Sequence, residues 1–141
     1  MDPEVWGNYG WKFLHITTLT YPECPTNIDK KSMKKFFESI KGTLPCYKCR
    51  IHYQEHLQKY PLTDDILSSR KNLIYWLIDI HNSVNRSLGK RELSYEEAIK
   101  SIEKIVNGNN EYNMYNYILY IIVIIFIILI LFSISLFFNK R

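Results

Sequence analysis

The chain has 141 residues, a formal net charge of +4 at pH 7 and only three cysteines. Charges of both signs are interspersed, so we interpret the densest basic cluster, residues 30–35, as a solvated helix face rather than a site for nucleic acid or phospholipid. Three cysteines are few for an extracellular fold held by disulfides. A Cys-x-x-Cys pair is therefore expected to be catalytic or metal-binding.

Apolar residues recurring at three- and four-residue spacing predict that the soluble part of the chain is helical. The first helix is expected over about 8–20, and the two prolines in 21–26 place a loop after it. A second helix is expected over about 29–42. A third begins at Pro45 or Cys46, where proline suits the first helical turn.

The clearest amphipathic pattern predicts a fourth helix, because its apolar positions fall on one face: Leu73, Leu77, Ile80 and Val84. Ser68 or Ser69 suits its N-cap and Gly89 its end. A capping box at Ser94 predicts a short fifth helix that ends near 107–110. The predicted fold class is therefore all-α, a four-helix bundle plus a short fifth helix, followed by one C-terminal transmembrane helix.

The C-terminal part of the chain is apolar on every side. Residues 112–139 contain no Asp, Glu, Lys or Arg, and a membrane-spanning helix needs about 20 apolar residues. We therefore predict a soluble domain over 1–106, a polar hinge over 107–116 and a transmembrane helix over 117–138.

The N-terminus is acidic and lacks the apolar region of a signal peptide. Because the predicted span ends three residues before the last residue, it is expected to insert after synthesis. The predicted location is a membrane that holds the chain by its C-terminal helix, with the domain on the cytosolic side.

Cys46 and Cys49 lie at the start of the predicted third helix, on one face of its first turn. Amide groups at a helix N-terminus carry partial positive charge and favour the thiolate form of a cysteine, and Lys48 adds a nearby cation. Thiolates attack disulfides. The placement therefore suits thiol–disulfide exchange.

Zinc is the rival interpretation of this segment, because His52 and His56 follow the cysteines at metal-ligand spacing. On one helix the four positions extend over about 15 Å. Tetrahedral zinc requires every donor within about 2.3 Å of the metal, which disfavours the zinc interpretation. A thioredoxin-like site is disfavoured because no βαβ pattern is present.

A second group of residues could bind a planar cofactor. Trp11 and His15 are four apart on the first helix, and His81 lies on the fourth with Asn82 and Asn85. Flat rings stack, and asparagine offers paired donors and acceptors. Taken singly, such residues are typical of a helical core. Beside a Cys-x-x-Cys pair they suggest a dithiol centre next to a bound planar cofactor.

Six motifs occur together in the chain: Trp11-x-x-Leu14-His15, Tyr21-Pro22-x-x-Pro25-Thr26, Pro45-Cys46-x-x-Cys49, Ser69-Arg70, Trp76-Leu77 and His81-Asn82-x-Val84-Asn85-x-x-Leu88-Gly89-Lys90. In their order and spacing the chain resembles the FAD-linked sulfhydryl oxidases of the ALR/Erv type, from about Trp6 to about Tyr95. It looks most like the short members encoded by large DNA viruses, and this resemblance implies a membrane of the host or virion as its location.

The resemblance implies a helical bundle that holds FAD, usually as a homodimer. By similarity, Cys49 lies against the flavin and Cys46 exchanges with substrate. Family flavin-contacting positions correspond to Gly7, Trp11, His15, His81, Asn82, Val84, Asn85, Leu88 and Lys90, and His52 and Arg86 fall on or beside such positions.

The function that the resemblance implies is oxidation of thiols to disulfides in a protein substrate or thioredoxin-like carrier. Electrons pass to oxygen and give hydrogen peroxide. The rival class is a non-enzymatic, membrane-anchored helical adaptor whose Trp and His residues belong to the core.

The chain also departs from the family pattern. Ile78 and Ser94 stand where a structural disulfide is often found, so packing must hold that region. Leu44 replaces the usual aromatic before Pro-Cys. Cys24 has no evident partner, and we interpret it as an idle thiol.

Overall fold

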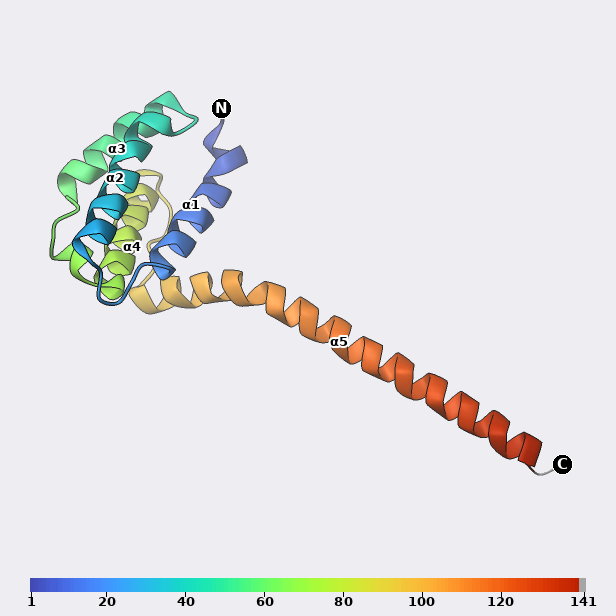
Figure 1. The fold of residues 1–141 in the computed structure, drawn as a ribbon. Coiled ribbons are helices and arrows are strands. Elements are labelled where there is room, and N and C mark those ends of the chain that lie inside the picture. The colour runs from blue at the N-terminus through green and yellow to red at the C-terminus, as the bar shows by residue number, and fades with distance from the viewer. Residues whose placement is uncertain (140–141) are drawn as a thin grey trace. The chain divides into compact units, whose positions relative to one another are not determined.

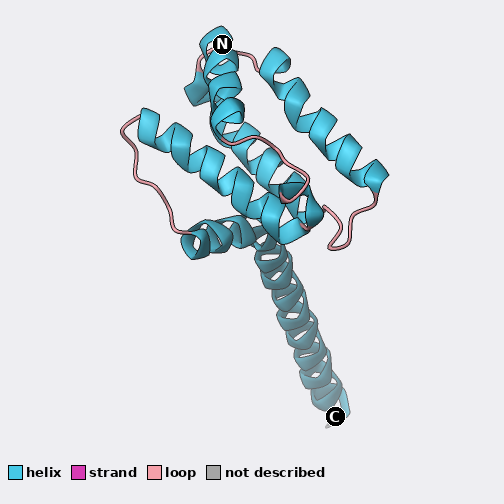
Figure 2. Ribbon diagram, turned by 90° about the vertical axis from the view of Figure 1, so that its left-hand side faces the viewer, coloured by secondary structure: helices cyan, strands magenta, loops and turns pink. Residues whose placement is uncertain are grey.

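The computed structural model describes residues 1–139, without the side chains of 109–113, 137 and 138. The described residues form helices and loops without β-strands, which confirms the predicted all-α class (Figure 2). The chain divides into two compact units, Met1–Ile102 and Glu103–Arg141. The candidate site lies in the first unit.

Local caps define the first two helices, whose course Figure 1 shows. Helix α1 spans Pro3–Leu19 and begins earlier than its apolar spacing predicts, because the Asp2 side chain caps it and Pro3 suits its first turn. Helix α2 spans Asn27–Thr43. Thr26 and Asp29 form a capping box at its start.

The next helices carry the predicted chemistry. Helix α3 spans Tyr47–Lys59, with Cys46 as its N-cap. A short 3-10 helix, η1, covers Ile66–Ser68. Helix α4 spans Arg70–Ser87 and is capped by Ser69, one of the two serines predicted for this role. Gly89, at φ +66°, follows the end of α4 in the left-handed conformation that glycine favours.

Helix α4 lies at the centre of the bundle. It packs against α1, α3 and η1, while α2 packs against α3 and η1. The predicted apolar face is confirmed at three positions, since Leu73, Leu77 and Ile80 are fully buried. The core also contains Tyr21, Phe37, Ile40, Tyr53, Leu62, Leu67 and Trp76. This core fixes α1, α3 and α4 relative to one another and so positions the candidate site.

Helix α5 runs without interruption over Tyr95–Asn139. The sequence predicted that the fifth helix ends near the polar segment 107–110, and this prediction is wrong. An exposed glycine costs a helix only about 1 kcal/mol relative to alanine, and asparagine costs less, so continuing backbone hydrogen bonds outweigh the unfavourable residues. The division into 1–106, 107–116 and 117–138 stays a prediction.

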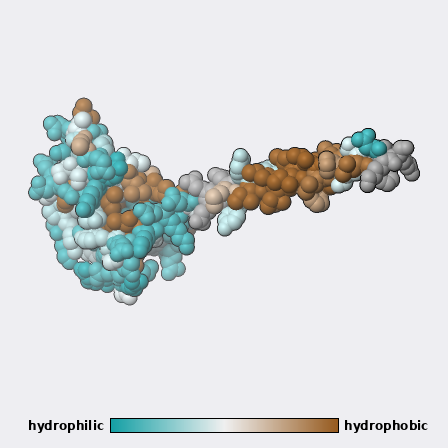
Figure 3. Space-filling view, turned by 90° about the horizontal axis from the view of Figure 1, so that it is seen from below, coloured by the Kyte–Doolittle hydropathy of each residue, from teal (hydrophilic) through white to brown (hydrophobic). Residues whose placement is uncertain are grey.

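The second unit contains an apolar helical stretch, Met114–Leu136, with a mean hydropathy of 3.3. Its 23 residues correspond to about 35 Å of helix, longer than the hydrocarbon core of a bilayer. Figure 3 shows this surface as an extended apolar band. The stretch is thus long and apolar enough to cross a membrane.

Candidate redox and cofactor site

Cys46 and Cys49 form a disulfide at the N-terminus of α3, with their Cα atoms 5.1 Å apart. The Cys49 amide donates a hydrogen bond to Cys46 Sγ at 3.3 Å. Both cysteines are half-buried. After reduction, the same amide and the partial positive charge of the helix end would stabilise a thiolate at Cys46.

Neighbouring contacts hold the disulfide loop independently of its S–S bond. The Arg50 Nε–H donates to the carbonyl oxygen of Leu44 at 2.6 Å, so α3 is tied to the residue before Pro45. Tyr53 donates through its hydroxyl to the Phe37 carbonyl at 3.1 Å and joins α3 to α2. Burial raises the pKa of Tyr53, so the hydroxyl remains protonated and able to donate.

Three predicted cofactor residues meet between α1 and α4. The Trp11 and His81 rings are stacked at a centroid distance of 3.9 Å and an angle of 6°. His15 Nε2 lies 3.0 Å from His81 Nδ1. The structure therefore gathers Trp11, His15 and His81 into one cluster, which we call the aromatic cluster.

Both histidines of the aromatic cluster are neutral at pH 7. Burial lowers the pKa of His15 to about 4. Burial also lowers the pKa of His81 to about 4, with smaller effects from His15 and Lys90. A neutral imidazole carries one donor and one acceptor, so one nitrogen can donate to the other across the 3.0 Å contact.

Two buried nitrogens in this region have no hydrogen-bond partner among the described residues, His15 Nδ1 and Trp6 Nε1. Buried polar atoms are nearly always paired, and an orphan needs an explanation. A bound molecule with polar groups and a flat ring system would supply partners. Gly7 lies one turn before Trp11, and a Cβ added there would meet nothing within 4 Å. These residues fit a planar cofactor.

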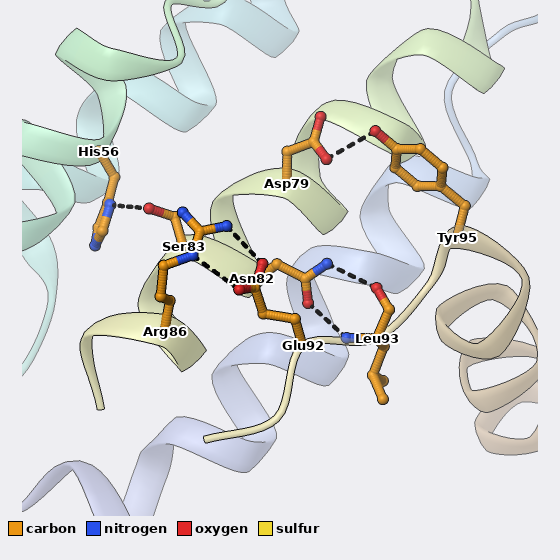
Figure 4. Close-up of polar contacts among 8 residues, drawn as sticks. All are labelled: His56, Asp79, Asn82, Ser83, Arg86, Glu92, Leu93 and Tyr95. Carbon is orange, nitrogen blue, oxygen red and sulfur yellow. Dashed lines mark hydrogen bonds and ion pairs between the residues drawn. The ribbon is translucent and has the colours of Figure 1, made fainter. Parts of the chain in front are cut away.

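Two other predicted cofactor residues are already engaged with the chain after α4 (Figure 4). The Asn82 amide donates to the Leu93 carbonyl at 2.8 Å and accepts from the Leu93 N–H at 3.0 Å. Arg86 pairs through Nε and Nη2 with the Glu92 carboxylate. This hydrogen bonding lowers the pKa of Glu92, so the carboxylate stays charged. Asn82 and Arg86 thus position the connection between α4 and α5.

The remaining predicted residues surround the end of α4 or lie on α3. Val84 and Asn85 are half-buried, and the Asn85 carbonyl accepts from the Lys90 amide at 2.8 Å. Leu88 is 61% exposed. Lys90 and His52 are also exposed. After burial and His15, the charge of Lys90 also contributes to the lowered pKa of His81.

Sequence reasoning missed two positions. His56 Nδ1 lies 3.0 Å from Ser83 Oγ and connects α3 to α4. In the sequence His56 stands out only as a zinc ligand, although its spacing of seven from Cys49 indicates a shared helix face. A Cβ at Gly10 would lie 3.2 Å from the Trp6 ring, so the glycine leaves room for that indole. Among the described residues, no three His, Cys, Asp or Glu side chains form a group able to hold a metal.

Noncovalent contacts hold the region of Ile78 and Ser94, where members of the family often have a structural disulfide. Ile78 is buried, at 1% exposure. The Tyr95 hydroxyl donates to Asp79 Oδ1 at 2.8 Å (Figure 4). The Tyr95 ring stacks on Tyr75 at a centroid distance of 4.3 Å. Ser94 is exposed and caps α5 through reciprocal contacts with Glu97. Packing and hydrogen bonds therefore hold this connection.

The model of the Erv1 / Alr family matches residues 8–104. The chain belongs to this family. The match covers the disulfide, the aromatic cluster and the connection from α4 to α5. It confirms the resemblance that the sequence motifs indicated.

Relatives and solved structures of the Erv1 / Alr family agree with this membership. The chain is 58% identical over 104 residues to a "Probable FAD-linked sulfhydryl oxidase" of Acanthamoeba polyphaga mimivirus, covering 74% of this chain and 73% of the relative. It is 38% identical over 87 residues to "FAD-linked sulfhydryl oxidase ERV1" of Arabidopsis thaliana, covering 62% and 44%. The FAD binding domain of Erv1 from Saccharomyces cerevisiae matches with a TM-score of 0.63 and 29% identity, covering 68% and 89%.

Proposed function

We propose that this chain is an FAD-linked thiol oxidase in which Cys46 and Cys49 are the redox-active pair and oxygen is the electron acceptor, giving hydrogen peroxide. Membership of the Erv1 / Alr family and the names of its relatives support thiol oxidation with FAD. One observation carries the proposal for this site. A disulfide at a helix N-terminus lies in the same compact unit as the aromatic cluster, and that cluster has a buried nitrogen without a partner, His15 Nδ1.

The residues that would hold FAD are those of the aromatic cluster with their neighbours. Trp11 and His81 offer faces for ring stacking, and His15 Nδ1 offers an unused polar atom. Lys90 offers a cation suited to phosphate. The further candidates are Gly7, His52, Asn82, Val84, Asn85, Arg86 and Leu88. FAD supplies the capacity to take two electrons from a dithiol and pass them to oxygen.

Exchange with substrate begins at the disulfide. A substrate thiolate attacks Cys46 Sγ, forming a substrate–Cys46 disulfide while the Cys46–Cys49 bond breaks and Cys49 leaves as a thiolate. A second substrate thiolate attacks the substrate sulfur of that bond, releasing the oxidised substrate and a Cys46 thiolate. The hydrogen bond from the Cys49 amide to Cys46 Sγ supports this step, because it stabilises the departing thiolate.

An absorbance spectrum and an oxygen electrode test the proposal together. The full chain in neutral detergent, supplied with FAD, should retain the yellow cofactor through gel filtration and consume oxygen when dithiothreitol is added. Hydrogen peroxide should accumulate in step with oxygen loss. A folded protein that stays colourless and inactive with excess FAD would instead favour the adaptor class.

An exposed apolar face on α1 supports the homodimer as part of this proposal. Its residues are spaced by four, four and three, so they share one side of the helix: Val5, Tyr9, Phe13 and Ile16, with exposures of 63%, 72%, 60% and 38%. This side faces away from Trp11 and His15. Sedimentation should detect a dimer that Tyr9→Glu dissociates, whereas Tyr47→Glu, an equally exposed position on α3, should leave it intact.

The apolar stretch Met114–Leu136 supports a membrane anchor as the last part of this proposal. Deleting 112–141 should release the protein from membranes and leave oxidase activity in place. Loss of FAD on truncation would contradict this independence. A cytosolic orientation predicts that protease added outside sealed vesicles digests the domain. Protection would place the domain in the lumen.

A further inference from the structure

The positive charge of the chain is concentrated in one segment. Residues 24–50 contain seven Lys or Arg and two Asp or Glu, giving a net charge of +5 against +4 for the whole chain. The rest of the chain is therefore slightly acidic overall. The basic segment comprises α2 and the disulfide at the start of α3.

Two of these lysines lie on one side of α2. Lys34 and Lys41 are exposed, three residues before and four residues after the buried Phe37. The Phe37 carbonyl accepts from Tyr53 of α3, whereas the neighbouring Phe36 ring packs against α1. Residues three or four apart share a helix face. Lys34 and Lys41 therefore share the side of α2 on which Phe37 lies. Lys41 lies two residues before the last residue of α2, next to the short connection to Cys46.

The start of α3 adds an exposed apolar pair. Tyr47 lies between the two cysteines in sequence and is 74% exposed, and Ile51, four residues later on the same face, is 42% exposed. Lys48 is exposed beside them. An aromatic residue that stands in solvent next to a reacting disulfide is well placed to contact whatever brings a thiol to Cys46.

We propose that Lys34, Lys41, Tyr47, Lys48 and Ile51 form a docking surface for a thiol-bearing polypeptide with acidic residues around its cysteine and an apolar side chain beside it. The inference deepens the proposed function and rests on exchange at Cys46. Carboxylates complement the lysines and speed encounter, while Tyr47 and Ile51 provide apolar contact. A polypeptide fits better than a lipid surface, because the half-buried Cys46 must admit a substrate sulfur at this same place.

The test uses the full chain with FAD in neutral detergent and three dithiols of different charge. The probes are dithiothreitol, a short Cys-x-x-Cys peptide flanked by Glu and Leu, and the same peptide flanked by Lys and Leu. At low ionic strength the acidic peptide should have a kcat/KM about tenfold above that of the basic peptide, and molar salt should remove most of the difference.

Matched variants locate the effect. Lys34→Glu/Lys41→Glu should reverse the peptide preference, whereas Lys71→Glu/Lys100→Glu, with the same charge change on α4 and α5, should preserve it. Tyr47→Ser should lower kcat/KM for both peptides several-fold. Each variant should keep its rate with dithiothreitol within twofold of the parent.

Fluorescence anisotropy with the cysteines of both peptides replaced by serine gives a readout independent of turnover. The acidic peptide should bind more tightly, and Lys34→Glu/Lys41→Glu should remove that advantage. Turnover of dithiothreitol with no peptide preference would overturn the docking surface and leave the oxidase proposal standing. Failure with dithiothreitol would overturn the oxidase proposal, and anisotropy would then decide the docking surface alone. The docking surface would also be overturned if Lys34→Glu/Lys41→Glu lost binding to lipid vesicles but kept the peptide preference.

Discussion

Two connections in the bundle are held by different chemistry. The Cys46–Cys49 disulfide joins the α2–α3 connection to the first turn of α3, and Arg50 binds Leu44 beside it. The connection after α4 relies on the Asn82–Leu93 pair of hydrogen bonds and on further noncovalent contacts. A disulfide that opens in every turnover cannot alone maintain its loop. The second connection performs no redox chemistry, and its contacts are indifferent to reductant.

The largest effect is expected when one cysteine of the disulfide is removed. Cys46→Ser and Cys49→Ser should each lower oxidase turnover by about a thousandfold or more, because neither can form the exchanging disulfide. The two should still differ when mixed with a peptide carrying an activated disulfide. Cys49→Ser should trap the peptide at Cys46, as mass spectrometry would show. Preferential trapping by Cys46→Ser would reverse the assigned roles.

The next largest effect is the acid sensitivity that the aromatic cluster gives to the folded domain. Burial lowers the pKa of His15 and His81 to about 4, below about 6.5 in an unfolded chain. The unfolded chain therefore binds more protons in this window, and stability should fall as pH drops from about 6.5 to about 4. Between pH 7 and pH 5 the loss should be on the order of 4 kcal/mol, about 2 kcal/mol from each histidine.

Urea unfolding at pH 7 and pH 5 would measure this loss, with FAD absent from both samples. His15→Gln/His81→Gln should show a much smaller difference between the two pH values. An unchanged difference in that double variant would mean that other groups control the acid sensitivity.

A smaller effect should follow from breaking the second connection. Asn82→Ala leaves the Leu93 N–H and carbonyl without their side-chain partner and should lower the free energy of unfolding by about 2 kcal/mol. Gln58→Ala, at an exposed position of α3, should change it by less than about 0.5 kcal/mol. Thermal melts of the two variants give the comparison. Equal melting temperatures would show that Asn82 does not hold the connection.

The smallest expected effect is that of reductant on a protein without the redox pair. Cys46→Ser/Cys49→Ser, loaded with FAD, should melt at the same temperature with and without reductant, because Cys24 is free and exposed. A clear loss of stability would mean that Cys24 forms a bridge, most simply to a second chain. Adding Cys24→Ser should then abolish the sensitivity.

Local sequence signals located most of the helices. Ser69, the Ser94 capping box and Gly89 act within a few residues of their partners, so their roles could be predicted. The same holds for Cys46 at the start of α3. The predicted end of the fifth helix failed, because the cost of a few weak helix formers did not exceed the gain from continued backbone hydrogen bonding.

The partners of the site side chains depended on contacts distant in sequence. From the sequence, Asn82 is equally suited to a cofactor or to the backbone, and only packing of the later segment against α4 gives it Leu93. The stack of Trp11 on His81 likewise requires α1 and α4 to meet. Sequence thus determined the helices, their caps, the dithiol and the apolar stretch, because these arise within a few turns of chain. Tertiary structure decided which polar atoms are satisfied and which stay unpartnered, because a side chain's partner depends on the packing of every helix around it.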